Sequence, residues 1–290
     1  MPRVAYVNGR FVPLAKAVVH VEDRGYQFAD GAYEVVAILN GRPLDLGPHL
    51  DRLAWSLGEL EIAQPMARRA LESVIAHLLA RNAARDALLY VQVTRGVARR
   101  DHAFPAVRPS LVMTVRPFDF AARWRAAQAG VAVALRPDER WARPDIKSVS
   151  LLPNVLAKET ARREGAFEAW FVDRDGLVTE GSSTNAWIVT PAGEVVTRPK
   201  GRAILAGVMR ALLLRLAREG VAIRERTFTA EEALAASEAF LTSTTNPCLP
   251  VVAIDGHAIG TGRPGALSQR LRAMVWDEIA RQTGWSPPPA

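Results

Sequence analysis

The chain has 290 residues, enough for one large or two medium domains with cores of their own. Hydrophobic residues make up 49% and charged residues 23% of it, which argues against a disordered chain, a collagen-like repeat or a coiled coil. The formal net charge of +7 suggests nucleic acid or an anionic membrane as a partner. However, no block of five or more like charges occurs, so a solvated, arginine-rich surface is the better interpretation.

The first half of the chain is predicted to contain four stretches of strand and two helices. Asn8-Gly9, between two short apolar pairs, is typical of a β-hairpin. Runs of apolar residues predict further strands over residues 33–39, 87–94 and 111–115. Apolar residues at helical spacing predict helices over 48–60 and 65–81. The sequence then changes character, which predicts a domain over 1–118, a linker over 119–126 and a second domain over 127–290.

The second half repeats this mixture of strands and helices. Strands are predicted over 131–135, 169–172, 185–189, 221–224, 239–242 and 251–254. Helices are predicted over 151–164, 207–219, 230–235 and 266–281. Strands and helices in both halves indicate an α/β or α+β architecture.

Several common motifs are absent or out of context. Residues 260–265 match G-x-G-x-x-G, but the chain ends before a second strand could supply an acidic residue. The five histidines show no ligand spacing, so no metal site is expected. The only cysteine, Cys248, excludes an intrachain disulfide. No signal-like or membrane-length apolar stretch is present, and we expect a cytoplasmic protein.

Lysine is scarce, since only four of the 37 basic residues are lysines. A lysine amine can act as a nucleophile, whereas a guanidinium stays charged. Lys158 is expected on a solvated helix face, and the surroundings of Lys16 and Lys200 are turns. Lys147 is expected at a strand end, just before a helix with an apolar face, where its pKa could be lowered. Local context alone makes Lys147 the best of the four.

Polar residues cluster at the ends of three predicted elements. Residues 179–185 and 242–247 are rich in hydroxyls, and Gly207 opens a helix whose N–H groups could bind an anion. Each cluster alone is more typical of an ordinary turn. Together with a lysine, a carboxylate and an arginine, they are what a phosphorylated aldehyde cofactor would need.

These segments resemble the class IV (fold type IV) pyridoxal-phosphate aminotransferases, and most closely the D-amino-acid aminotransferases. The resemblance runs nearly end to end and is most specific over residues 22–36, 49–53, 92–96, 145–148, 179–183 and 242–245. It implies a two-domain fold with a small N-terminal α/β domain and a larger C-terminal mixed-sheet pseudo-barrel. It also implies that pyridoxal 5'-phosphate binds at the domain interface and that the enzyme is a homodimer.

The resemblance further implies a role for individual residues. Lys147 would form a Schiff base with the cofactor and carry the 1,3-proton shift of a ping-pong transamination, while Glu180 would face the pyridine nitrogen. The remaining cofactor-binding residues would be Arg52, Ser182, Ser183, Leu205, Val208, Met209, Ser243 and Thr244. The residues that bind the substrate would be Tyr33, Val35, Arg100 and His102, with the Arg100/His102 loop supplied by the neighbouring subunit.

Three residues depart from the family pattern, namely Ser150, Trp187 and Met209, and Met209 would remove a hydroxyl from the phosphate site. The expected activity is transfer of the amino group from D-amino acids to 2-oxo acids, of the D-alanine/2-oxoglutarate type. Alternatives with the same cofactor are an (R)-amine transaminase, a branched-chain L-amino-acid aminotransferase and an aminodeoxychorismate lyase. A catalytically idle cofactor-binding protein and a nucleic-acid-binding protein are the further alternatives.

Overall fold

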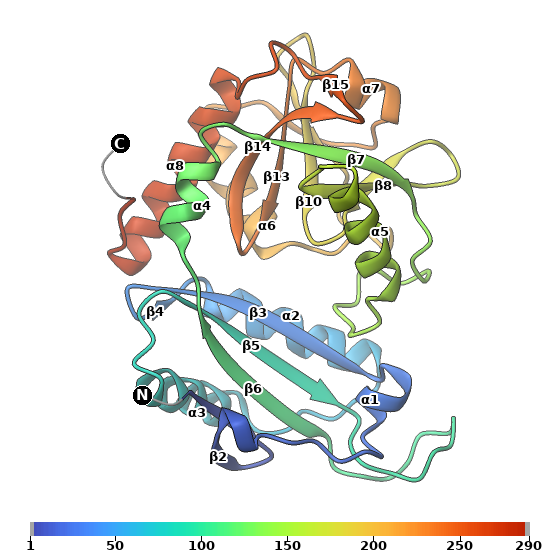
Figure 1. Cartoon of the computed structure of the whole chain (residues 1–290), viewed down its shortest axis with the longest axis vertical. Coiled ribbons are helices and arrows are strands. Elements are labelled where there is room, and N and C mark those ends of the chain that lie inside the picture. Colours follow the sequence, from blue (N-terminus) through green and yellow to red (C-terminus); the bar gives the residue numbers. More distant parts are fainter. Residues whose placement is uncertain (1–2, 288–290) are drawn as a thin grey trace. The chain divides into compact units, whose positions relative to one another are not determined.

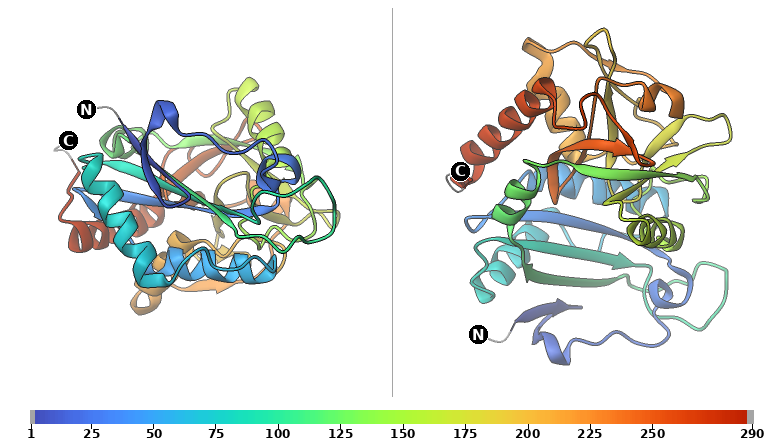
Figure 2. Two further views of the ribbon diagram at one scale, coloured as in Figure 1. Left: turned by 90° about the horizontal axis from the view of Figure 1, so that it is seen from below. Right: turned by 45° about the horizontal axis from the view of Figure 1, so that its top comes forward.

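The computed structural model describes residues 3–287, and for Glu219 only its backbone (Figures 1 and 2). The chain divides into two compact units. Unit 1 comprises Met1–Asp119, Ile146–Ser150 and Gln282–Trp285, and unit 2 comprises Phe120–Asp145, Leu151–Arg281 and Ser286–Ala290. The segment that contains Lys147 therefore packs with the N-terminal part of the chain.

Unit 1 is built on a six-stranded antiparallel sheet of order β2-β1-β6-β5-β3-β4. Its strands are β1 (Val4–Val7), β2 (Arg10–Pro13), β3 (Gly31–Leu39), β4 (Arg42–Pro43), β5 (Ala87–Thr94) and β6 (Ser110–Pro117). Its helices are α1 (Arg24–Phe28), α2 (Leu46–Glu59), α3 (Arg68–Arg81) and the 3-10 turn η1 (Leu14–Lys16). Asn8 and Gly9 both have positive φ angles, 44° and 91°, as the predicted hairpin requires.

The core of unit 1 lies between this sheet and the helices α2 and α3. Leu50, Leu53 and Leu57 form the apolar stripe of α2 and are at most 2% exposed. They pack in one cluster with alternate residues of β3, including Val36 and Ile38. Because side chains alternate along a strand, Glu34 lies on the same face of β3 as Val36, while Tyr33 and Val35 lie on the opposite face.

Unit 2 is built on a nine-stranded mixed sheet of order β12-β11-β10-β13-β14-β7-β8-β9, with β15 paired to β14. Its strands are β7 (Val131–Pro137), β8 (Glu168–Val172), β9 (Val178–Gly181), β10 (Asn185–Val189), β11 (Val195–Thr197), β12 (Ile223–Glu225), β13 (Glu238–Ser243), β14 (Asn246–Ile254) and β15 (His257–Ala258). Its helices are α4 (Phe120–Ala126), α5 (Leu152–Arg163), α6 (Val208–Leu216), α7 (Ala230–Leu234), α8 (Ala266–Thr283) and the 3-10 turn η2 (Ala217–Glu219).

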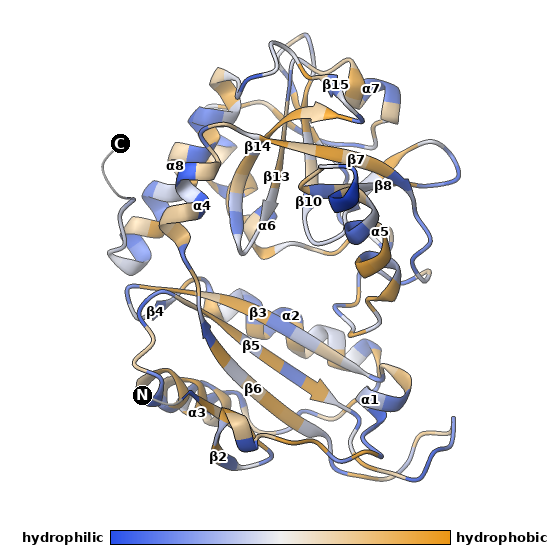
Figure 3. Cartoon of the chain, in the orientation of Figure 1, coloured by the Kyte–Doolittle hydropathy of each residue, from blue (hydrophilic) through white to orange (hydrophobic). Residues whose placement is uncertain are grey.

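The sheet of unit 2 curls, because β9 at one end of the order turns directly into β10 near the other end. The Gly181 N–H donates to the carbonyl of Thr184 at 2.7 Å, and this hydrogen bond closes the turn. All five residues of β10 are buried, and Figure 3 shows the apolar character of β7 and β14. The sheet thus encloses its own core, as in a half-barrel.

The mixed two-unit fold that we predicted is confirmed, and most predicted elements occur within a few residues of their expected limits. Two polar segments differ. Residues 178–181, expected as part of a turn, form the strand β9, and residues 120–126 of the expected linker form α4. The exact domain limits stay a prediction, and residues 288–290 of the second one lie outside the described range.

Candidate active site

Lys147 lies in a short extended segment beside β3 rather than at the end of a regular strand. The Tyr33 N–H donates to the Lys147 carbonyl (3.0 Å), and Ser148 forms an isolated bridge with Ala32. The Lys147 N–H donates to Ser56 Oγ of α2 (3.2 Å). The backbone of this lysine is therefore fixed to two elements of unit 1.

The Lys147 side chain is half-buried, and its Nζ lies 4.3 Å from the centroid of the Tyr33 ring. Within residues 3–287 its amine makes no hydrogen bond or ion pair. The Tyr33 ring in turn lies 5.6 Å from that of Tyr90, centroid to centroid. The arrangement leaves the amine beside aromatic surface and available to react with a carbonyl group.

A buried ion-pair cluster joins β3 to α2. Arg52 donates from Nε to Glu34 Oε1 (2.7 Å) and from Nη2 to Glu34 Oε2 (2.9 Å). His49 Nδ1 lies 2.7 Å from Glu34 Oε2, and Glu34 is fully buried. The two-point contact fixes the orientation of the guanidinium of Arg52, the predicted phosphate ligand.

Burial and charge act in opposite directions on this cluster. Burial would raise the pKa of Glu34, but the charge of Arg52 and the hydrogen bonds from His49 and Arg52 lower it to about 2. Burial lowers the pKa of His49, and the charges of Arg52 and Lys147 lower it further against the effect of Glu34. Neutral His49 thus donates its Nδ1–H to an ionised Glu34.

Glu180 lies on β9 in unit 2 and is 4% exposed. Its Oε1 accepts from Arg140 Nη1 and from the Leu205 N–H (3.0 Å), and its Oε2 accepts from Asn185 Nδ2 (3.0 Å). Burial would lower the pKa of Arg140, but a hydrogen bond to Asp138 and the charges of Glu180 and Asp138 raise it. A permanently charged guanidinium therefore fixes the predicted pyridine-facing carboxylate.

The turn after Glu180 is held by a second buried carboxylate, Glu168 of β8. Glu168 is fully buried and accepts from Ser182 Oγ and, at 2.8 Å, from Ser183 Oγ. Lys158 Nζ lies 3.3 Å from Glu168 Oε1 and also donates to the Phe167 carbonyl. Two of the predicted cofactor-binding hydroxyls are thus engaged with a carboxylate of the protein.

The remaining predicted cofactor residues of unit 2 lie in two turns. Gly207 is the N-cap of α6, and Val208 and Met209 follow it as buried residues of its first turn. A helix leaves its first N–H groups without partners inside the helix, so these two are suited to an anion. Ser243 ends β13 and Thr244 begins the turn to β14, where Ser243 Oγ accepts from the Asn246 N–H (3.1 Å).

Arg100 and His102 lie together in the exposed loop between β5 and β6. Arg100 Cζ is 4.6 Å from the centroid of the Phe28 ring, and the His102 ring is 5.3 Å from it. Arg24 anchors this loop by donating to the carbonyl of Asp101. In the described part of the chain no hydrogen bond or ion pair joins Tyr33 to Arg100 or His102, so the expected substrate-binding set is not assembled by direct contacts within one copy.

Some expectations from the sequence are wrong. Lys158 is not on a solvated helix face, because its amine reaches Glu168 and a backbone carbonyl. Arg140 and Arg210 are not surface cations, since their side chains are 5% exposed. Sequence analysis also missed five residues that position the site, which are Glu34, His49, Asp138, Arg140 and Glu168. Only Glu34 gave a signal in the sequence, because it is the single acid within the apolar run of β3.

The residues present suit a phosphorylated aldehyde. Lys147 offers an amine without a hydrogen-bond partner among residues 3–287, Arg52 a fixed guanidinium, and α6 its first N–H groups. Glu180 is a buried acceptor of the kind that a protonated pyridine nitrogen would contact. In contrast, no group of three or more metal-ligating side chains occurs in the described residues, and none of their helices could span a membrane.

Comparisons with known proteins agree with this chemistry. The family "Amino-transferase class IV" matches residues 31–254. The chain is 40% identical over 277 residues to a D-alanine aminotransferase of Bacillus licheniformis, covering 95% of this chain and 97% of that protein. A D-alanine aminotransferase of Listeria innocua is 36% identical, with 96% of each chain covered. The branched-chain amino acid aminotransferase of Escherichia coli has the same fold, with a TM-score of 0.88, 22% identity, and 98% of this chain and 96% of that one covered. The chain therefore belongs to the class IV aminotransferases and uses pyridoxal 5'-phosphate.

Proposed function

We propose that this aminotransferase moves the amino group of D-amino acids to 2-oxo acids, with Lys147 as its catalytic residue. The observation that carries this role is the half-buried Lys147 amine, which lies 4.3 Å from the Tyr33 ring without a hydrogen-bond partner in residues 3–287. The choice of D-amino acids is supported by relatives at 35–40% identity that are D-alanine aminotransferases. The similarity to branched-chain enzymes, at 22% identity, supports the fold alone.

The cofactor, when bound, withdraws electrons from the bonds at the substrate Cα. Lys147 Nζ would then accept the α-proton of the substrate, and the hydrophobic Tyr33 ring would limit the solvation of that amine. Glu180, kept in place by Arg140 and Asn185, would stabilise positive charge at the ring nitrogen. Both oxygens of Glu180 are held by hydrogen bonds, which is the preorganisation that catalysis needs.

For phosphate binding and for substrate binding we propose the residues that the family resemblance implies. Arg52 and the first N–H groups of α6 would hold the phosphate, helped by the Thr244 hydroxyl. Tyr33 and Val35 lie on one face of β3 and would contact the substrate. The guanidinium of Arg100 is suited to the substrate α-carboxylate.

The exposed position of Arg100 supports a homodimer in which this loop completes the site of the neighbouring subunit. Arg100 lies on the Phe28 ring, and within residues 3–287 no hydrogen bond joins it to Tyr33 of its own copy. Each site of a symmetric dimer would then consist of Lys147 from one copy and Arg100 from the other. The cytoplasmic location stays a prediction.

The reaction is tested with half-reactions of the cofactor-loaded enzyme and D-alanine, L-leucine, (R)-1-phenylethylamine or aminodeoxychorismate. We expect the spectrum to change with D-alanine and much less with the others. Lys147→Ala should abolish the change, whereas Lys200→Ala, in an exposed turn, should leave it intact. Conversion of L-leucine or the amine alone would refute the proposed specificity, and full activity of Lys147→Ala would refute the catalytic role.

The crossing loop is tested by mixing two inactive variants, Lys147→Ala and Arg100→Ala, under conditions that exchange subunits. If the loop crosses, each mixed dimer has one intact site, and about a quarter of the wild-type activity should return at equal mixing. If Arg100 serves its own copy, no mixed dimer has an intact site, and activity stays at the level of the separate variants.

A further inference from the structure

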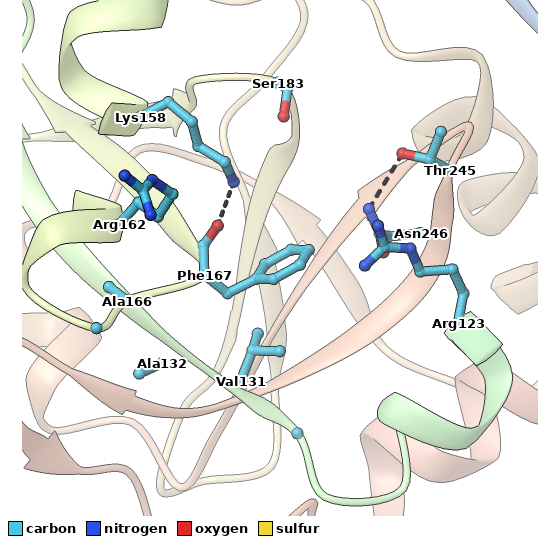
Figure 4. Close-up of a pocket in the computed structure, with 12 residues that line it drawn as sticks. Arg123, Val131, Ala132, Lys158, Arg162, Ala166, Phe167, Ser183, Thr245 and Asn246 are labelled. Atoms are coloured by element: carbon cyan, nitrogen blue, oxygen red, sulfur yellow. Dashed lines mark hydrogen bonds between the residues drawn. The ribbon is translucent and has the colours of Figure 1, made fainter. Parts of the chain in front are cut away.

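Unit 2 contains a pocket to which the proposed reaction assigns no role. Its volume is about 720 Å³, which is within the range of small-molecule sites. Figure 4 shows how side chains from α4, α5, β7 and the β13–β14 turn surround it. Twelve residues line it, among them Arg123, Lys158, Arg162, Phe167, Ser183 and Asn246.

The lining of this pocket is cationic. It includes Arg123, Lys158 and Arg162, while none of its twelve residues is acidic. Lys158 and Arg162 are four residues apart on α5, which places them on one face of the helix. Ser183 and Asn246 add a hydroxyl and an amide. Such a lining suits an anionic ligand.

Two of the three cations converge on one aromatic ring. Lys158 Nζ lies 4.5 Å and Arg123 Cζ 5.8 Å from the centroid of Phe167. Arg162 differs from them, because its side chain is 70% exposed and bonded at two points to Glu159. Solvent screens such a pair, which leaves Arg123 and Lys158 as the cations beside the ring, with the charge of Lys158 paired with the buried Glu168.

The pocket is connected through Lys158 to the turn that follows Glu180. The lysine amine contacts the buried Glu168, and Glu168 accepts from the hydroxyls of Ser182 and Ser183. Ser183 itself lines the pocket, as does Thr245 beside Thr244. A ligand at Lys158 would therefore lie next to both turns that are expected to contact the cofactor.

We propose that this pocket binds the carboxylate of a small organic acid, through Lys158 and Arg123 as cations. Two kinds of molecule could supply this carboxylate. It is either the far carboxylate of a dicarboxylic substrate, which rests on the proposed function, or a separate acid that acts on the turn through Lys158 and Glu168.

The site itself is tested by titrating glutarate, a dicarboxylate without an amino or oxo group, into the cofactor-loaded enzyme in a calorimeter. Lys158→Met and Arg123→Met remove the charges from α5 and from α4 separately, so a loss of binding in both does not depend on the contact of Lys158 with Glu168 alone. Arg163→Met is the matched control, since this residue is on α5 but 75% exposed and outside the lining.

We expect Lys158→Met and Arg123→Met each to weaken glutarate binding by about tenfold or more, equivalent to about 1.4 kcal/mol. The control should change it by less than about twofold. A wild-type enzyme that does not bind glutarate, or unchanged binding in both charge variants, would overturn the proposal. Binding at the Arg100 loop alone is one such result, because it would be insensitive to these two changes.

Half-reactions separate the two sources. If the pocket receives the far carboxylate of the substrate, both variants should raise KM for D-glutamate about tenfold, and Arg123→Met should leave KM for D-alanine unchanged. If it receives a separate acid, glutarate should alter the D-alanine half-reaction in the wild type and not in the variants, with an unchanged ratio of the two KM values. Lack of reaction with any D-amino acid would refute the proposed function, while the glutarate titration would still decide the fate of the pocket.

Discussion

Replacing Glu34 by glutamine should destabilise the protein much more than the same replacement at Glu159. Both carboxyl groups have a pKa lowered to about 2. Glu34 is fully buried and reaches this value against the effect of burial, through the charge of Arg52 and its hydrogen bonds. Glu159 is exposed, and hydrogen bonds from two arginines one turn further along α5 lower its pKa. The pair therefore differs in burial and not in the size of the pKa change.

The magnitude for Glu34 follows from its pKa. A decrease from 4.5 to about 2 corresponds to about 3.4 kcal/mol of stabilisation at neutral pH. Removing one partner of a buried ion pair costs about 3–5 kcal/mol, since the other charge is left buried. We therefore expect Glu34→Gln to lower the free energy of unfolding by about 3 kcal/mol, with Arg52 as the uncompensated charge. At Glu159 solvent screens the pair, and Glu159→Gln should leave the unfolding midpoint unchanged.

The assay is urea unfolding of the cofactor-free protein and both variants, at neutral pH and near pH 3. Because the folded pKa of Glu34 is below its unfolded value, its stabilisation is complete above about pH 4.5 and is lost as the pH falls toward 2. The penalty of Glu34→Gln should accordingly shrink in acid. Equal midpoints for the two variants, or a Glu34→Gln penalty that is independent of pH, would refute the assignment of this stabilisation to a buried ion pair.

Three shorter predictions concern the other unit. A Cβ at Gly207 would lie 2.0 Å from Asn185 Oδ1, so Gly207→Ala should displace the amide that holds Glu180. The cofactor dissociation constant should rise about tenfold, while the circular dichroism spectrum stays unchanged. Met209→Thr would restore a hydroxyl at the start of α6, and fluorescence titration should show cofactor binding tighter by about tenfold. Burial raises the pKa of Cys248 to about 12, so a thiol reagent should label it only after unfolding in urea.

The fold was predictable where the pattern of apolar residues along the sequence reflects regular burial. The strand 87–94 was found at its observed limits, because apolar residues there alternate or run continuously into a buried sheet. The strand β9 was not, since its residues Thr179, Glu180 and Gly181 are typical of a turn. Its polar side chains are buried with partners from Asp138 and Arg140, which are 41 and 40 residues away in the sequence. A pattern within one segment contains no information about such partners.

The same distinction applies to the lysines. Lys147 could be ranked first from its neighbours, because Pro144 and the polar residues around it indicate a break between elements. Lys158 was misassigned, because the Glu and Arg residues near it on α5 predict a solvated face. Its amine instead reaches the carboxylate of Glu168, on the strand that follows the helix. The contact depends on how α5 packs on β8, which sequence spacing does not specify.

Burial also explains part of the excess of arginine over lysine. Arg24, Arg95, Arg210 and Arg272 are all at most 7% exposed. Arg95 donates to both oxygens of Asp30 and to two backbone carbonyls, which a lysine ammonium could not do with the same geometry. A buried cation costs less when most of its donors are satisfied, and the five N–H groups of a guanidinium can serve several acceptors at once. The basic composition is therefore partly a property of the interior, and it cannot be converted into a surface potential or a polyanionic partner by counting residues.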